Sequence, residues 1–79
     1  MQLFIDSAII DEVRKVAEWG VLDGCTTNPT LAAKAGKNYN AVLKEICSII
    51  KGPVSAETVS LNAEGMVKEG IAFSKIAKN

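Results

Sequence analysis

The stretch Asp23-Gly24-Cys25-Thr26-Thr27-Asn28-Pro29-Thr30 decides the fold of this 79-residue chain. A short run typical of a β-strand ends here in small polar side chains, and a proline opens the next segment. Asn28 is a competent N-cap, and Pro29 suits the first position of a helix because that position needs no backbone N–H. The stretch is therefore predicted to be the point where a strand ends and a helix begins.

Two other short apolar runs end in the same way. Leu3-Phe4-Ile5 is followed by Asp6, and the run that begins at Val54 carries Glu57. These runs predict strands near residues 3–6, 21–27 and 54–59. Apolar residues at helical spacing predict helices over 9–19, 30–35 and 39–50, and a last helix that begins after Asn62.

The predicted order is β-α-β-α-α-β-α, without any hairpin signal. Strands separated by amphipathic helices form a parallel sheet. Such sheets are covered on both faces or closed into a barrel, and three βα units cannot close a barrel alone. Residues 1–79 are therefore predicted to be one α/β domain that belongs to something larger, covalently or by assembly.

Composition excludes several classes of function. Nine basic and nine acidic residues give zero net charge, which argues against binding to nucleic acid or a membrane surface. The chain has no histidine, the commonest metal ligand and general base. No apolar stretch reaches the roughly 20 residues of a membrane span, and no secretory signal is present. Cys25 and Cys47 lack metal-ligand spacing, so we expect two buried thiols in a cytoplasmic protein.

Polar residues gather at the predicted strand ends, where catalytic groups collect in parallel βα folds. Side-chain alternation groups Thr26 with Asn28 and Ser55 with Glu57. The predicted inner set is Asp6, Thr26, Asn28, Ser55 and Glu57. Two close carboxylates raise each other's pKa and suit proton transfer, whereas Asn and Thr suit a polyhydroxylated ligand. The alternative makes Asp6 and Asn28 simple caps and Glu57 a solvated strand end.

Several motifs are similar to those of one enzyme family. Thr26-Thr27-Asn28-Pro29-Thr30-Leu31 resembles the second-strand signature of transaldolases, T-T-N-P-S-L. Phe4-Ile5-Asp6-Ser7-Ala8 resembles their first strand, F-L-D-T-A, and Val54-Ser55-Ala56-Glu57 resembles their third. The likeness covers all 79 residues without a gap, and it is strongest to the small bacterial transaldolases and fructose-6-phosphate aldolases.

The resemblance implies the first three βα units of a (β/α)8 TIM barrel, a partial barrel with parallel strands. It implies an enzyme that uses neither metal nor cofactor and whose lysine forms a Schiff base with a ketose phosphate. A dihydroxyacetone unit then passes to an aldose phosphate. The partners implied are sugar phosphates.

The resemblance also assigns roles to individual residues. Asp6 is the implied acid/base of C–C cleavage, Asn28 is implied to hydrogen-bond the bound intermediate, and Glu57 to act through a water on formation and hydrolysis of the Schiff base. Thr26, Thr27 and Ser55 are the implied substrate-binding residues. The aldolase relatives carry glutamine at the position of Glu57, which favours a transaldolase.

The chain departs from the family in length. The family's Schiff-base lysine lies on the fourth strand, expected just after Asn79, and every lysine here lies on a predicted helix or loop. We therefore expect no Schiff-base lysine in this chain and no activity of the chain alone. The alternative is a non-enzymatic fragment that forms a homo-oligomer through its open strand edges, or joins the remainder of a barrel.

Overall fold

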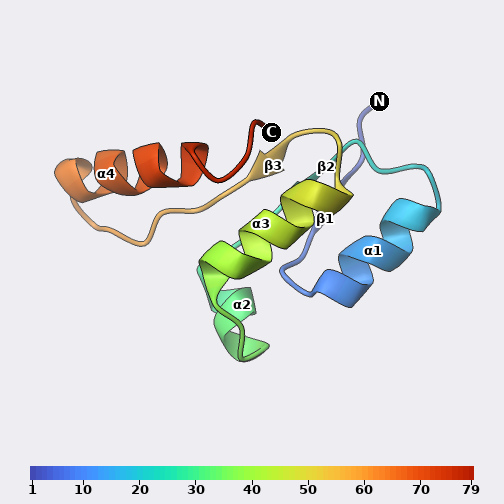
Figure 1. Cartoon of the computed structure of the whole chain (residues 1–79), viewed down its shortest axis with the longest axis horizontal. Coiled ribbons are helices and arrows are strands. Elements are labelled where there is room, and N and C mark those ends of the chain that lie inside the picture. Colours follow the sequence, from blue (N-terminus) through green and yellow to red (C-terminus); the bar gives the residue numbers. More distant parts are fainter.

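In the computed structural model of the protein, which describes residues 1–79, strands and helices alternate in the predicted order (Figure 1). The elements are β1 (Phe4–Asp6), α1 (Ile10–Glu18), β2 (Gly24–Thr26), α2 (Pro29–Lys34), α3 (Tyr39–Ile49), β3 (Val54–Ser55) and α4 (Ala63–Ser74).

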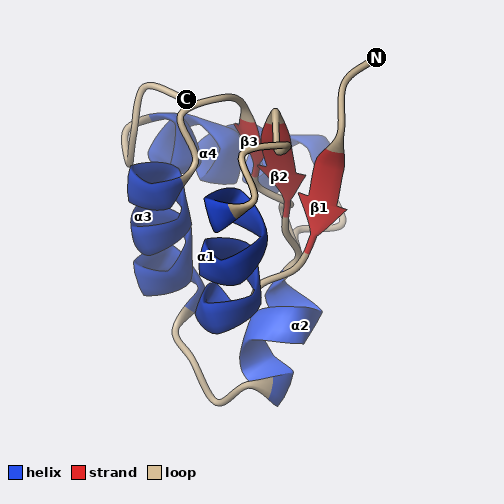
Figure 2. Ribbon diagram, turned by 90° about the vertical axis from the view of Figure 1, so that its right-hand side faces the viewer, coloured by secondary structure: helices blue, strands red, loops and turns tan.

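The three strands form one parallel sheet in the order β1-β2-β3. Its register pairs Asp6 with Thr26 and Thr26 with Ser55, so the last residues of the three strands lie side by side. Helices α1 and α3 cover one face of this sheet, and the opposite face is bare (Figure 2). The predicted class, an open α/β arrangement of three parallel strands consistent with a partial barrel, is confirmed.

The strands are shorter than predicted. β2 covers Gly24–Thr26 within the predicted range 21–27, and β3 covers only Val54–Ser55 within 54–59. Single ladder bonds flank β2, from Asp23 N to Leu3 O at 2.8 Å and from Thr27 N to Ser55 O at 3.2 Å. β2 then ends because the chain turns into α2, and residues 56–59 have no strand beside them to continue the ladder.

Asparagine side chains start three of the helices. The Oδ1 atoms of Asn28, Asn38 and Asn62 accept the backbone N–H of Leu31, Ala41 and Gly65, at 2.8, 3.1 and 2.7 Å. Each bond satisfies one of the N–H groups that a helix start leaves unpaired. The predicted caps at Asn28 and Asn62 are therefore confirmed, and Pro29 is the first residue of α2 as expected.

The hydrophobic core lies between the sheet and its helices. Its members are apolar side chains of β2, the first three helices and their connections: Ala8, Val13, Cys25, Ala32, Val42, Ile46 and Ile50. Only 11 of the 79 residues are buried, so the chain has a thin core for its length. Cys25 is buried as predicted, whereas Cys47 is only partly buried and corrects the prediction of two buried thiols.

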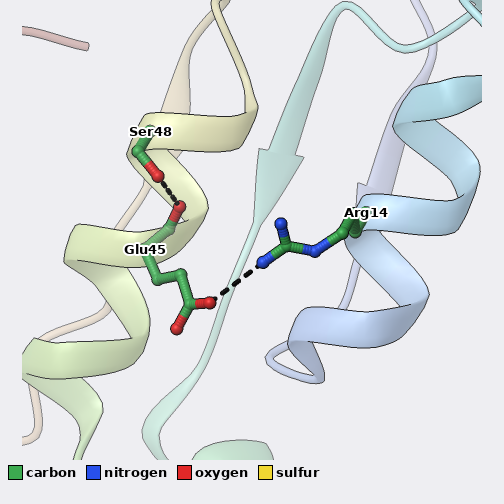
Figure 3. Close-up of polar contacts among 3 residues, drawn as sticks. All are labelled: Arg14, Glu45 and Ser48. Carbon is green, nitrogen blue, oxygen red and sulfur yellow. Dashed lines mark hydrogen bonds and ion pairs between the residues drawn. The ribbon is translucent and has the colours of Figure 1, made fainter.

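An ion pair joins the two helices that cover the sheet. Arg14 Nη2 of α1 lies 3.0 Å from Glu45 Oε1 of α3 (Figure 3). The two side chains are 50% and 51% exposed, so the pair contributes at most about 1 kcal/mol. Ser48 Oγ donates to the Glu45 carbonyl oxygen at 2.6 Å within α3. Val13 of α1 and Ile46 of α3 are both fully buried in the core that these helices share with the sheet.

The last helix stands apart from this core. No residue of α4 is buried, and the helix extends beyond β3 on the side away from α1 (Figure 1). After α4 the chain returns to the sheet, where Asn79 O accepts the Val54 N–H at 2.8 Å. Asn79 Nδ2 also donates to the carbonyl oxygens of Ile50 and Gly52, at 2.7 and 2.9 Å. None of the helices has both the length and the hydrophobicity needed to cross a membrane.

Candidate active site

The ends of β1 and β2 bring a carboxylate and a hydroxyl together on the bare face of the sheet. Thr26 Oγ1 donates to Asp6 Oδ1 at 2.9 Å. The preceding register pair, Ile5 and Cys25, faces the core, and Cys25 is fully buried. Alternation along each strand therefore places Asp6 and Thr26 on the opposite, uncovered face.

The third strand follows the same alternation. Val54, Ala56 and Thr58 line a cavity of about 360 Å³ between α3, β3 and α4. Ser55 and Glu57 do not line it, which supports their predicted position on the bare face. The cavity itself is mostly apolar and contains none of the predicted site residues, so it is not the candidate active site.

Thr27 is not placed as expected. Its side chain is only 4% exposed, and its hydroxyl donates to Ser55 O at 2.8 Å and lies 2.7 Å from Tyr39 OH. The alternation that puts Thr26 on the bare face turns Thr27 toward α3. The structure therefore places the Thr27 side chain in the packing between β2, β3 and α3 rather than on the bare face, and its role in substrate binding stays a prediction.

Tyr39 connects the ends of the second and third strands and was missed by the sequence reasoning. Its hydroxyl accepts the Glu57 N–H at 2.9 Å and lies within hydrogen-bond distance of Thr27 Oγ1. Because the single Thr27 hydroxyl proton goes to Ser55 O, Tyr39 is the donor to Thr27. The bonds thus run in one direction, from Glu57 N–H through Tyr39 and Thr27 to Ser55 O.

The ring of Tyr39 is fixed as well as its hydroxyl. It packs edge to face against Phe73 of α4, with ring centroids 5.7 Å apart and an interplanar angle of 89°. In the sequence Tyr39 is simply one apolar-face residue of a helix. Its hydroxyl was the only available signal, because a tyrosine placed in packing needs a polar partner.

Asn28 and Glu57 complete the strand-end residues. Asn28 Oδ1 caps α2, as expected from the alternative in which Asn28 is a helix cap. Its Nδ2 makes no hydrogen bond within the chain. The Glu57 side chain is exposed beyond the end of β3, and its carboxylate makes no hydrogen bond within the chain. Asp6 and Thr26 are therefore in direct contact, while Glu57 is connected to the second strand only through its backbone.

Nucleophilic groups are scarce around these residues. Every lysine is exposed and lies on a helix or a loop rather than on a strand. Burial raises the pKa of the Cys25 thiol, and the nearby Asp6 carboxylate raises it further, against the Ser7 hydrogen bond that lowers it. A protonated thiol is a poor nucleophile, so the site offers acid/base and hydrogen-bonding groups only.

Comparison with known proteins identifies the family. Residues 3–79 match the family described as Transaldolase/Fructose-6-phosphate aldolase. Over its whole length the chain is 57% identical to a probable transaldolase of Leptospira biflexa and 58% identical to one of a Hydrogenobaculum species. A probable transaldolase of Aquifex aeolicus is 51% identical over the same 79 residues.

The matches cover all of this chain but only 36% or 37% of each of these relatives. The chain therefore spans a little over a third of the length of the curated proteins it matches. Because the family match extends over nearly every residue, the chain belongs to the transaldolase/fructose-6-phosphate aldolase family.

Proposed function

We propose that this chain supplies the first three βα units of a transaldolase-type active site, which transfers a dihydroxyacetone unit between sugar phosphates. The observation that carries the proposal is the Thr26–Asp6 hydrogen bond of 2.9 Å at the carboxyl ends of adjacent parallel strands. Strand ends of this kind are where (β/α)8 enzymes place their reacting groups. Family membership supports the same activity for a protein that contains these units.

Asp6 acts as the acid/base of this reaction. Its carboxylate accepts the proton of the sugar hydroxyl as the C–C bond breaks and returns it when the new bond forms. Thr26 orients this carboxylate by donating to Oδ1, which leaves Oδ2 to face the substrate.

The other strand-end groups recognise the substrate. Asn28 donates its Nδ2 protons to an oxygen of the bound intermediate, since its Oδ1 is used as the cap of α2. Ser55 is paired with Thr26 in the register and lies beside it at the same strand end, where it contributes to substrate binding. Glu57 acts through a water molecule on formation and hydrolysis of the Schiff base, and the exposed position of its carboxylate is suited to this.

The reacting lysine comes from outside these three strands. A Schiff-base lysine must lie with its amine at the carboxyl ends of the strands, and no strand here carries a lysine. The carbonyl oxygen of Asn79 already occupies the free edge of β3, which is where a further parallel strand would pair. The 79-residue chain alone is therefore inactive and needs a further strand to complete the site.

The test is a chimera in which this chain replaces the matching 79 residues of the Leptospira biflexa relative. Fructose 6-phosphate and borohydride are expected to trap a covalent adduct on a lysine of the chimera and none on the isolated chain. Transfer to an aldose phosphate acceptor distinguishes a transaldolase from a fructose-6-phosphate aldolase, which releases dihydroxyacetone without an acceptor. A folded chimera that forms no adduct would refute the proposal. An adduct on the isolated chain would refute the claim that this chain contains no Schiff-base lysine.

A second, non-enzymatic function is favoured by the exposed sheet. β1 and β3 each have a strand neighbour on one side only, and Phe4 on the bare face is 43% exposed. Open edges and apolar faces of this kind promote strand pairing between chains. If the chain acts as a self-associating unit, light scattering after size exclusion will give the mass of a homo-oligomer, whereas a stable monomer would contradict this alternative.

A further inference from the structure

The segment that carries Glu57 has no regular secondary structure, but several of its backbone N–H groups are hydrogen-bonded to side chains of the protein. Residues 56–62 connect β3 to α4 without helix or strand. Backbone N–H groups of such a segment ordinarily bond to water or to side chains. Here three of them bond to side chains of two different helices, α3 and α4, and these bonds restrain the connection.

The restraint at the far end of the segment comes from one carboxylate. Glu69 Oε1 accepts the Val59 N–H at 3.1 Å, and Glu69 Oε2 accepts the Ser60 N–H at 2.9 Å. The two oxygens of one side chain thus bind two consecutive amides, and an ionised acceptor makes each bond stronger than a neutral one. At the near end, Tyr39 OH accepts the Glu57 N–H at 2.9 Å.

The start of α4 fits closely against the same segment. A Cβ atom added to Gly65 would collide with the Ser60 side chain, so only glycine permits this approach. Gly65 N also donates to Asn62 Oδ1 at 2.7 Å. The segment is therefore seated on the first two turns of α4, and Glu69 is placed in the second of these turns where its side chain reaches back to residues 59 and 60.

We propose that Glu69 is a positioning residue for Glu57, because it holds the segment that presents the Glu57 carboxylate at the sheet end. Glu69 itself does not touch the substrate. Tyr39 fixes Glu57, the first residue of the held region, and Glu69 fixes Val59 and Ser60, two and three residues later. The inference rests on the proposed function, which gives Glu57 its role, and it adds a residue that determines where Glu57 lies.

The test uses NMR on the complete 79-residue chain and compares the wild type with Glu69→Gln, Glu69→Asp and Glu64→Gln. Gln keeps one acceptor but turns an amide N–H toward the second backbone N–H, and Asp keeps the charge but shortens the reach. Glu64→Gln is the matched control, because Glu64 lies on the same helix and is 82% exposed with only Lys68 as partner. Retained protection of the Ile46 amide shows that each variant is folded.

Amide exchange reports on the segment itself. In Glu69→Gln and Glu69→Asp, the Val59 and Ser60 amides are expected to exchange about tenfold faster, equivalent to about 1.4 kcal/mol. The nuclear Overhauser contact between the Glu57 amide and the Tyr39 ring is expected to weaken as well. Unchanged exchange and an unchanged Glu57–Tyr39 contact would overturn the inference.

Titration with fructose 6-phosphate separates the inference from the proposed function, and it uses the chimera with the Leptospira biflexa relative, in wild-type form and with each of the three substitutions, because only the chimera contains the further strands of the site. If both hold, wild type and Glu64→Gln show shifts at Thr26, Asn28 and Glu57, while the Glu69 variants keep the first two and lose the shift at Glu57. Equal Glu57 shifts in all four proteins would overturn the positioning role. If the wild type shows no shift at any of these residues, the proposed function fails, and exchange together with the Glu57–Tyr39 contact decides the positioning role by itself.

Discussion

Thr27→Val is the sharpest test of the hydroxyl chain between the second and third strands. Valine has nearly the same shape as threonine, so the substitution removes little apart from the hydroxyl. Thr27 is only 4% exposed. Its hydroxyl donates to Ser55 O at 2.8 Å and accepts from Tyr39 OH at 2.7 Å. Water cannot replace it without entering the packing of β2 against α3.

The cost follows from the bonds lost. A net contribution of about 0.5–1.5 kcal/mol for each of two bonds predicts a loss of about 2 kcal/mol in the free energy of unfolding. Tyr39→Phe removes the Tyr39–Thr27 bond and the bond from Glu57 N to Tyr39 OH. Because the second bond is exposed, we expect a loss of about 1.5 kcal/mol in the free energy of unfolding. Because both variants delete the same Tyr39–Thr27 bond, the double variant should cost about 1 kcal/mol less than the sum.

Urea denaturation followed by circular dichroism measures all three values. Thr30→Val is the matched control, because Thr30 is exposed on α2, and its effect is expected to stay within about 0.5 kcal/mol. Thr27→Ser keeps the hydroxyl and should recover most of the loss. A cost below about 0.5 kcal/mol for Thr27→Val, or strictly additive effects in the double variant, would refute the chain of hydrogen bonds.

Two further predictions concern the core and the thiols. Ile46→Ala is expected to cost about 3 kcal/mol because Ile46 is fully buried, whereas Ile71→Ala, at 52% exposure, should cost less than 1 kcal/mol by the same denaturation assay; equal costs would contradict the position of the core. Burial raises the pKa of both Cys25 and Cys47, so the folded chain keeps thiol protons that the unfolded chain loses. Their contribution to stability is complete below the unfolded pKa of about 8.5 and is lost as pH rises through the folded pKa. Unfolding at pH 7 and pH 10 measures this loss, which should shrink in Cys25→Ala, and iodoacetamide should label the partly exposed Cys47 before Cys25.

Local chemistry carried the prediction of the elements. Asn28 before Pro29 and Asn62 before an apolar stripe identified helix starts because a cap depends on residues within one turn. The parallel order of the strands also followed, since amphipathic helices separated every pair of apolar runs. Strand ends did not follow in the same way, because residues 56–59 have a β-like sequence but lack a neighbour to pair with, and residues 21–23 make only the single ladder bond from Asp23 N to Leu3 O.

The candidate site was predictable where it depends on alternation along one strand. That rule groups Thr26 with Asn28 on one face and turns Thr27 to the other, although the family resemblance had added Thr27 to the substrate-binding residues. Tyr39 and Glu69 could not be found in this way. Their contacts with Glu57, Val59 and Ser60 join segments 9–18 residues apart, and nothing in the local sequence indicates which turn of a helix will face the connection.

The role of Asp6 is tested most directly by the turnover number for dihydroxyacetone transfer in the chimera with the Leptospira biflexa relative. Asp6→Asn keeps the size of the side chain and an acceptor for Thr26 but removes the base. The expected result is a fall of about 10²–10⁴ in kcat, while Asp11→Asn, on the exposed first turn of α1, leaves kcat unchanged. A chimera that transfers the unit equally fast with Asp6→Asn would contradict the assignment of this strand end as the acid/base site.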